Sequence, residues 1–328
     1  MTRAVEIWFL NRTLRSYTLL LLVILVFTFL APGFDFLSAR TLSSVFQYFA
    51  TIGLVALALG LTMIVREFDI SVAGMMSLGG CIAVLFGNES ALVGLALAVF
   101  VGCAGGVLQS YLMIKFNLSS VAVTLGGLLT WLGLAYVITG NQTIPFNQMD
   151  VAIAINTTWF LGLSPRALVV IALFVVAALF VGLTRVGRDM VAIGSHRNAS
   201  VVAGINPNRI LLGVFSVSGA LASLAGAMLS FGLSSASPSG GVTDVLVPAV
   251  AAVILGGVSL SGGVGRPMGI AAGMLILCVT RTGLTSLGVD PYVHDVVTGL
   301  ILLVVAITDG AHLRMRLHQG IRVVRNGP

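Results

Sequence analysis

Charged side chains are scarce in this sequence, at 9% of its 328 residues, whereas soluble domains carry about 25%. Hydrophobic residues make up 58%, and the mean hydropathy is +1.08. So little charge excludes a water-soluble fold, and the apolar runs leave no stretch long enough to enclose a separate aqueous core. We therefore expect one all-α, polytopic transmembrane bundle, with a single domain over residues 1–328.

Cysteine and lysine are also rare, and each shortage excludes a kind of site. The three cysteines, Cys81, Cys103 and Cys278, lie in apolar runs without a Cys-x-x-Cys spacing, so neither a disulfide framework nor a zinc site is indicated. The single lysine, Lys115, lies outside any Gly-x-x-x-x-Gly-Lys loop that would bind nucleotide phosphates. We expect no metal or cofactor on this chain, and any ATPase must be a separate subunit.

Catalytic motifs are missing as well. The sequence has no Ser/His/Asp order and no His-Glu-x-x-His, and its histidines lie in or beside connections rather than on one apolar run. The chain is therefore not predicted to be an enzyme. Its net charge of +6 comes from basic residues at the ends of apolar runs. That distribution indicates membrane orientation rather than nucleic-acid binding.

Long apolar runs dominate what is present. About ten approach the length of roughly 20 residues that crosses a bilayer. The third, eighth and ninth are short and rich in glycine, which is typical of tilted, broken or re-entrant segments. The runs are Ser16–Leu30, Ser44–Val65, Ile70–Phe86, Ala91–Met113, Leu118–Thr139, Arg166–Leu183, Ile210–Leu233, Val245–Val258, Pro267–Gly283 and Val293–Thr308.

The basic residues are distributed unevenly between the two sides of these runs. With the N-terminus inside, only Arg40, Arg166 and Arg281 fall on or near the outer side. The positive-inside rule then predicts an even number of spans, a cytoplasmic N-terminus over residues 1–15 and a cytoplasmic tail over residues 310–328. Arg314 and Arg316 in that tail are interpreted as a topology anchor or as a contact with membrane lipid.

Small residues recur four apart in several runs, and this spacing lets helices approach closely within a bilayer. Such pairs predict tight packing inside the bundle or, alternatively, a dimer face. They are Gly102 with Gly106, Ala222 with Gly226, and Gly269 with Gly273.

The densest charge near a membrane boundary is Arg66-Glu67-Phe68-Asp69, followed by Ile70 to Gly74. A charge at the bilayer centre costs about 2.5–3.5 kcal/mol on insertion scales, so charges placed there are often functional. One interpretation makes Glu67, Asp69 and Ser71 part of a gate or translocation path. The other pairs Arg66 with Glu67 or Asp69 and simply ends a helix at the interface.

The longest basic connection spans residues 185–209. Ser195 or Asn198 is predicted to cap a short helix that Gly204 ends, because a side-chain acceptor satisfies free amides and glycine tolerates the left-handed conformation. Such a helix on the cytoplasmic side suits the docking of a partner protein. A plain linker is the alternative.

Three stretches together resemble the permease subunits of ribose-type, carbohydrate-importing ABC transporters. The similarity runs from about the second apolar run to the last. The stretches are Phe68 to Gly74 with Leu78-Gly79-Gly80; Gly187-Arg188 through Gly194 to Ala203-Gly204-Ile205; and Leu255 to Gly265 with Gly288 to Tyr292 and the ending from Thr298 to Asp309.

The resemblance implies an importer of the bacterial inner membrane. Two cytoplasmic ATPase subunits would hold ATP and Mg²⁺, a second permease copy or a paralogue would complete the path, and an extracytoplasmic sugar-binding protein would deliver substrate. The ATPase would contact a coupling helix. One departure is that Asn198-Ala199-Ser200 replaces the family's usual Glu-Ala-Ala. The coupling residues carried over are Arg188, Ser195, Asn198, Ala199, Ser200 and Gly204.

Sequence alone names no sugar site. Polar and aromatic candidates are present in several runs, but their faces are unknown without a structure. The main alternative function is a secondary transporter coupled to protons or sodium through Glu67 and Asp69; a membrane enzyme or a receptor-like protein is the second. The candidates for sugar contact are Gln47, Gln109, Asn117, Thr124 and Trp131.

Overall fold

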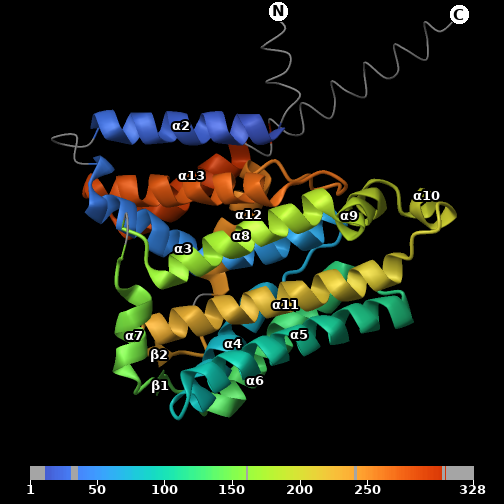
Figure 1. Cartoon of the computed structure of the whole chain (residues 1–328), viewed down its shortest axis with the longest axis horizontal. Coiled ribbons are helices and arrows are strands. Elements are labelled where there is room, and N and C mark those ends of the chain that lie inside the picture. The colour runs from blue at the N-terminus through green and yellow to red at the C-terminus, as the bar shows by residue number, and fades with distance from the viewer. Residues whose placement is uncertain (1–11, 31–35, 160–161, 240–241, 305–306, 308–328) are drawn as a thin grey trace, which may run out of the picture.

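The computed structural model describes residues 12–30, 36–159, 162–239, 242–304 and 307. The expected cytoplasmic tail over residues 310–328 and residues 1–11 of the expected N-terminal segment lie outside this part. The described chain is a bundle of helices with two short antiparallel strands, β1 (Ile144–Pro145) and β2 (Ser235–Ala236) (Figure 1). The helices are α2 (Arg12–Leu30), α3 (Ala39–Ile64), α4 (Val72–Gly87), α5 (Ala91–Phe116), α6 (Ser120–Thr139), α7 (Met149–Asn156), α8 (Pro165–Leu183), α9 (Arg185–Ser195), α10 (Arg197–Val202), α11 (Pro207–Gly232), α12 (Val242–Leu255), α13 (Pro267–Ser286) and a last helix, Pro291–Val304.

Ten of the described helices are long or apolar enough to match the ten predicted runs. Six have the length and composition to cross a membrane, namely α3, α5, α6, α8, α11 and α13. Four shorter apolar helices are Leu14–Leu30 within α2, Val72–Gly87, Asp244–Leu255 and Pro291–Val304. The prediction of a polytopic all-α membrane protein with about ten apolar segments is confirmed.

Two of the three runs expected to be short are short helices. α4 has 16 residues and α12 has 14, with Pro248 inside it; at 1.5 Å per residue they reach about 24 and 21 Å, less than the roughly 30 Å hydrocarbon core. The ninth run is neither short nor broken, because α13 is a continuous helix of 20 residues. Gly269 and Gly273 pack against α12, and Gly283 packs against Phe27 of α2.

Small residues hold the core together. A Cβ atom on Gly102 would collide with the Gly219 carbonyl of α11, and one on Gly106 with the Phe215 carbonyl. In the same way Gly273 approaches the Ala252 carbonyl of α12. The predicted close packing inside the bundle is confirmed, and these glycine faces are covered by the chain's own helices rather than left free for a second copy.

α3 and α11 occupy the middle of the bundle. α3 is buried along most of its length and contacts α11, α12, α13 and α8, while α11 packs against α4 and α5. Figure 1 shows α2 and α13 on one side of α3, and α5 and α6 on the far side of α11. The contact between α3 and α11 therefore joins the two halves of the molecule.

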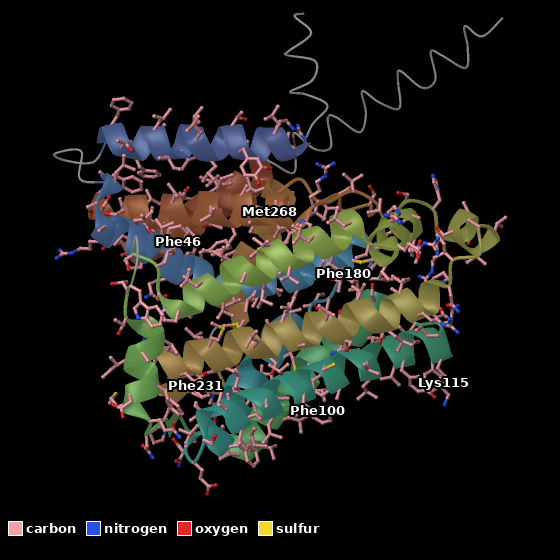
Figure 2. The ribbon with its side chains drawn as sticks, in the orientation of Figure 1. Phe46, Phe100, Lys115, Phe180, Phe231 and Met268 are labelled. Carbon is pink, nitrogen blue, oxygen red and sulfur yellow. The ribbon has the colours of Figure 1, made fainter. Side chains whose placement is uncertain are left out.

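The two ends of the bundle differ in composition. The basic end, as we name it, carries α9 and α10, and Lys115 lies at this end in Figure 2. The opposite end carries α7, β1 and β2 (Figure 1). The described basic residues at the basic end include Arg66, Lys115, Arg185, Arg188, Arg197, Arg209 and Arg266, and those at the opposite end include Arg40, Arg166 and Arg281.

Side-chain hydrogen bonds join the elements of the opposite end. The Arg166 Nε donates to Gln47 Oε1 at 2.5 Å, and the Gln47 amide donates to the Asn156 carbonyl at 3.2 Å. The Asn156 amide in turn donates to the Gly232 carbonyl at 2.7 Å. These bonds tie α3, α7, α8 and α11 together.

Candidate functional site

The connection over residues 185–209 folds into two helices before α11 begins. The Thr184 hydroxyl accepts the Gly187 N–H at 3.1 Å and so caps α9, which buries Met190 and Ile193. α10 follows after His196 and lies beyond the end of α8, at the edge of the bundle (Figure 1). The connection is therefore organised as helices, as predicted, and is not a plain linker.

Gly204 ends α10 as predicted. Its φ is +82°, its N–H donates to the Val201 carbonyl, and the Ile205 N–H donates to the Ser200 carbonyl, both at 3.0 Å. This pair of bonds is the Schellman arrangement, which places a left-handed residue just after the helix. The predicted cap by Ser195 or Asn198 is wrong. His196 occupies the N-cap, and its side chain makes no cap bond. The Ser195 hydroxyl donates instead to the Val191 carbonyl at 2.9 Å.

α10 exposes an apolar surface beside two hollows. Val202 is 90% exposed and Val201 is 54% exposed. One hollow of about 480 Å³ is lined by Arg66, His196, Arg197, Asn198 and Ala199; the other, of about 560 Å³, is lined by Arg197, Asn198, Val201, Gly204, Ile205, Asn206, Pro207 and Asn208.

Two of the predicted coupling residues are bonded to nearby backbone carbonyls. Ser200 is buried and its hydroxyl donates to the His196 carbonyl at 3.0 Å. Arg188 is on α9 and donates to the Leu183 carbonyl at 3.3 Å. Within the described connection, Asn198, Ala199 and Gly204 are the predicted residues that line a hollow and remain exposed.

The glycine-rich stretch after α12 locks α9 to α3. The Gly263 N–H donates to the Ile64 carbonyl at 2.9 Å. A Cβ on Gly194 would collide with that same carbonyl, and a Cβ on Gly263 would collide with Ser195. Gly263 has φ of +72°, a conformation that glycine adopts without a steric penalty. Backbone thus lies directly on backbone at this junction.

Arg66 ends α3 in a left-handed conformation, with φ of +68°. Its N–H donates to Met63 and the Glu67 N–H donates to Thr62, each at 3.0 Å, which again is the Schellman pattern. The expectation that this residue ends a helix is confirmed. The expected pairing of Arg66 with Glu67 or Asp69 is wrong, because both carboxylates have other partners.

Glu67 forms an ion pair with α10. The Arg197 guanidinium lies 2.9 Å from Glu67 Oε1, with the Glu67 side chain only 12% exposed and that of Arg197 47% exposed. The two residues are 130 positions apart in the chain. The predicted gating cluster and the predicted coupling helix are therefore in direct contact.

Asp69 is buried and surrounded by hydroxyl groups. Its Oδ1 accepts the Ser71 N–H at 3.1 Å and the Ser71 hydroxyl at 2.6 Å, while Oδ2 accepts the Ser218 hydroxyl at 2.8 Å. The carboxylate thus lies at the N-terminal end of α4, where the helix dipole favours negative charge. Ser218 is eleven residues into α11, a rise of about 16 Å from the basic end.

The segment from Arg66 to Ser71 enters the bundle without helical structure. The Phe68 N–H donates to the Ser120 hydroxyl at 3.3 Å, and the Thr124 hydroxyl donates to the Phe68 carbonyl at 3.1 Å. Both partners are in the first turns of α6. Because its backbone groups find partners on α6, the segment can descend toward Asp69 inside the bundle. The segment is therefore a non-helical link between α3 and α4, just before the third run.

Gln109 of α5 extends this polar network. It is 3% exposed, and its side-chain Oε1 is 3.0 Å from the Ser71 hydroxyl. The single Ser71 proton faces two acceptors, Asp69 Oδ1 at 2.6 Å and Gln109 Oε1 at 3.0 Å, and the contact with Asp69 is the shorter. The network then runs from α5 through Ser71 and Asp69 to α11.

Three of the five sugar-contact candidates lie near this network. Gln109 and Trp131 line one groove between α5 and α6, and Thr124 holds Phe68. Gln47 lies instead at the opposite end, bonded to Arg166. Asn117 caps α5 with φ of +52°. Ser218 and Arg197 were not predicted, since nothing in the sequence links them to partners more than a hundred residues away.

Among the described residues no cluster of three or more histidine, cysteine or acidic side chains forms a metal site. What the geometry does provide is an exposed helix at the basic end, an ion pair, and a buried polar network that reaches the bundle interior. This arrangement is suited to transmitting a displacement of α10 to the inside of a membrane-spanning bundle.

Comparison with known proteins agrees with a role in membrane transport. A family described as "Branched-chain amino acid transport system / permease component" matches residues 41–306. The chain belongs to this family of transport-system permease components.

Particular relatives cover nearly the whole chain. It is 32% identical over 302 residues to the ribose import permease protein RbsC of Escherichia coli (strain K12), which covers 90% of this chain and 92% of the relative. It is 32% identical to the probable ABC transporter permease protein YphD of the same strain, with 92% and 91% covered. The L-arabinose transport system permease protein AraH of that strain is 28% identical, with 78% of each chain covered. No solved structure matches.

Proposed function

We propose that this chain is the membrane-spanning permease subunit of an ABC importer for a small carbohydrate. Its relatives are named for ribose and L-arabinose transport, so an aldopentose or a sugar of similar size is the favoured substrate. The family's description mentions branched-chain amino acids, but the ribose and L-arabinose permeases match most of the chain and support a sugar as the substrate. The observation that carries the mechanism is the Arg197–Glu67 ion pair, which joins an exposed helix to the segment between α3 and α4.

α10 is the proposed docking element for the ATPase subunits, which supply ATP and Mg²⁺. The exposed valines of α10 and the two hollows beside it offer a partner both an apolar contact and polar groups. The acidic contact that the family usually has here is missing, because Asn198 carries no charge. A partner that binds α10 differently in its two nucleotide states would shift the equilibrium between two permease conformations.

Glu67, Asp69 and Ser71 are the proposed gating residues. Glu67 follows α10 through its ion pair, and Asp69 is two residues further along the same segment. A displacement of α10 would therefore pull on the buried carboxylate and its bonds to Ser71 and Ser218. No observation favours the alternative of an ion-coupled transporter, since both carboxylates are already held by protein groups.

The basic end is proposed to face the cytoplasm of a bacterial inner membrane, following the positive-inside rule. An even number of apolar helices would place both termini on that side. The opposite end would then receive the extracytoplasmic sugar-binding protein. A second permease copy or a paralogue, together with membrane lipid, would surround the path.

The test is reconstitution of the tagged chain with the ATPase subunits that co-purify with it, followed by uptake of labelled D-ribose or L-arabinose into proteoliposomes. We expect uptake to require ATP and the binding protein. Recovery of the chain without any ATPase, combined with uptake driven by a proton or sodium gradient, would overturn the proposal.

A matched pair of variants locates the docking surface. Val202→Asp places a charge on the most exposed apolar residue of α10, and we expect it to prevent ATPase co-purification. Leu233→Asp changes a residue at the opposite end that is 64% exposed, and we expect it to leave co-purification intact. Equal behaviour of the two variants would remove α10 from the docking surface.

A further inference from the structure

We propose that the groove between α5 and α6 is a sugar-contacting subsite of the translocation path, in which Trp131 and Gln109 recognise one sugar ring. This inference rests on the carbohydrate transport proposed above. It selects, from the five candidates for sugar contact in the sequence, the two that share one groove.

The groove has the size and lining of a small-molecule site. Its volume is about 360 Å³, within the range of roughly 300–1,000 Å³ typical of ligand pockets. Leucines line one part, while Gln109, Thr130 and Trp131 contribute polar groups. A Cβ atom on Gly126 would meet nothing within 4 Å, so the groove is open beside this glycine. Open space with a few polar groups is what a ring carrying hydroxyl groups requires.

Trp131 has an unsatisfied hydrogen-bond donor. The residue is 8% exposed, and its indole Nε1 is buried without an acceptor in the described part of the chain. An unpaired polar group is costly in a membrane protein, because lipid offers it no partner. A sugar hydroxyl or ring oxygen would accept this proton once the indole turns toward the groove, and the indole face suits the apolar face of a sugar. A lipid acyl chain in the groove would leave the N–H unpaired.

Gln109 is the second recognition group. A Cβ on Gly127 would lie 2.6 Å from the Gln109 side-chain nitrogen. A larger residue at position 127 would therefore displace the amide, so this glycine lets Gln109 reach the space between α5 and α6. An amide both donates and accepts hydrogen bonds, which matches the dual character of sugar hydroxyls.

The groove opens on the outer face of α5 and α6, away from the helix ends. Trp131 is eleven residues into α6 and Gln109 is seven residues before the end of α5, so they lie about 16 and 10 Å from the basic end. Transporter substrate sites commonly lie near the middle of the bilayer. A sugar in this groove would be within the membrane rather than at its surface.

The groove also connects to the docking helix. Gln109 contacts Ser71, Ser71 contacts Asp69, and two residues before Asp69 the Glu67 side chain holds Arg197 of α10. A movement of α10 that displaces this segment would change the hydrogen bonds available to Gln109. The subsite would then bind sugar in one conformation and release it in the other.

Filling the groove is the direct test, with two glycines of α6 as a matched pair. Gly126 lines the groove and Gly133 does not, yet a Cβ at either position would meet nothing within 4 Å. We expect Gly126→Leu to reduce ATP-driven uptake of labelled D-ribose and L-arabinose at least tenfold, with unchanged co-purification of the ATPase subunits. Gly133→Leu should transport like the original chain. Equal uptake by the two variants would overturn the inference.

Trp131 provides a readout independent of transport. In a chain carrying Trp8→Phe and Trp159→Phe, Trp131 is the remaining tryptophan. Adding either sugar to the assembled transporter should change its fluorescence emission, and Gly126→Leu should abolish the change. A chain that transports sugar without any response of Trp131 would contradict the subsite alone. A chain that transports neither sugar and binds neither would contradict the proposed function itself.

Trp131→Phe tests the donor, because it keeps an aromatic ring and removes the N–H. Loss of one neutral hydrogen bond predicts about a threefold to tenfold decrease in sugar uptake. Trp159→Phe is the control, since this residue is 71% exposed and lies outside the groove. Normal uptake by Trp131→Phe would exclude the N–H from recognition.

Discussion

One junction at the basic end and one at the opposite end of the bundle are held together by different means. At the basic end, glycines bring backbone directly against backbone where α3, α9 and the stretch around Gly263 meet. At the opposite end, the half-buried side chains of Arg166, Gln47 and Asn156 form the links. Close-packed backbone transmits displacement because it leaves no room to absorb it, whereas side-chain hydrogen bonds can be exchanged for water. We therefore expect α3, α9 and the stretch around Gly263 to move together.

The largest effect is expected from crowding the backbone junction. In Gly194→Val, even the Cβ atom would collide with the Ile64 carbonyl, and overpacking of this kind costs about 3 kcal/mol. We expect little folded protein and no uptake. Thermal unfolding in detergent measures the loss. Gly213→Ala is the control, since a Cβ there meets nothing within 4 Å, and a similar loss in that variant would show that the junction is not special.

The next largest effect separates backbone strain from coupling. Gly204 and Gly288 have φ of +82° and +76°, and a Cβ on either meets nothing within 4 Å. Valine should therefore impose a similar strain, about 1–2 kcal/mol, at both. We expect Gly204→Val to abolish ATP-dependent uptake while the chain stays in the membrane, and Gly288→Val to retain most of it. Uptake assays on equal amounts of inserted protein decide. Parallel losses would mean that strain, and not the end of α10, is responsible.

Removal of the buried carboxylate should have an intermediate effect. Asp69→Ala leaves the Ser71 and Ser218 donors without their acceptor, a loss of about 1.5–3 kcal/mol for bonds to a charged group. Asp69→Asn keeps one acceptor oxygen and should recover part of the stability. Asn156→Ala at the opposite end, where the side chain is half-buried, should cost less. Denaturation curves of the three variants give the order, and a greater loss in Asn156→Ala would reverse the comparison between the two ends.

The smallest effect is expected at the ion pair. Because the Arg197 side chain is nearly half exposed, its contribution to stability is at most about 1 kcal/mol and decreases with salt. A double-mutant cycle with Glu67→Gln and Arg197→Ala should give a coupling energy in that range for unfolding. If the pair also transmits movement, the same cycle on uptake should show a clear coupling. Additive effects on uptake would leave the pair with a purely local role.

The sequence predicted the fold well because hydropathy determines which segments enter a membrane. It also located α10 and its end, since Gly204 is a local signal that needs no tertiary information. It failed where partners are distant. Arg197 and Ser218 lie more than a hundred residues from Glu67 and Asp69, and the pairing of Arg66 was therefore assigned to its neighbours. The predicted cap of α10 was wrong because the Ser195 hydroxyl bonds to the Val191 carbonyl, one turn earlier in α9.

The left-handed conformation of Arg66 makes this position a target for a stabilising substitution. Glycine would take this conformation more easily than arginine, so Arg66→Gly offers a simple gain in stability. The chain keeps an arginine, whose side chain lines the hollow beside α10. A selection for thermostability alone would be expected to replace Arg66 and, with it, part of the surface presented to a partner. At this position, the stability of the isolated subunit and the transport activity of the assembled complex favour different residues.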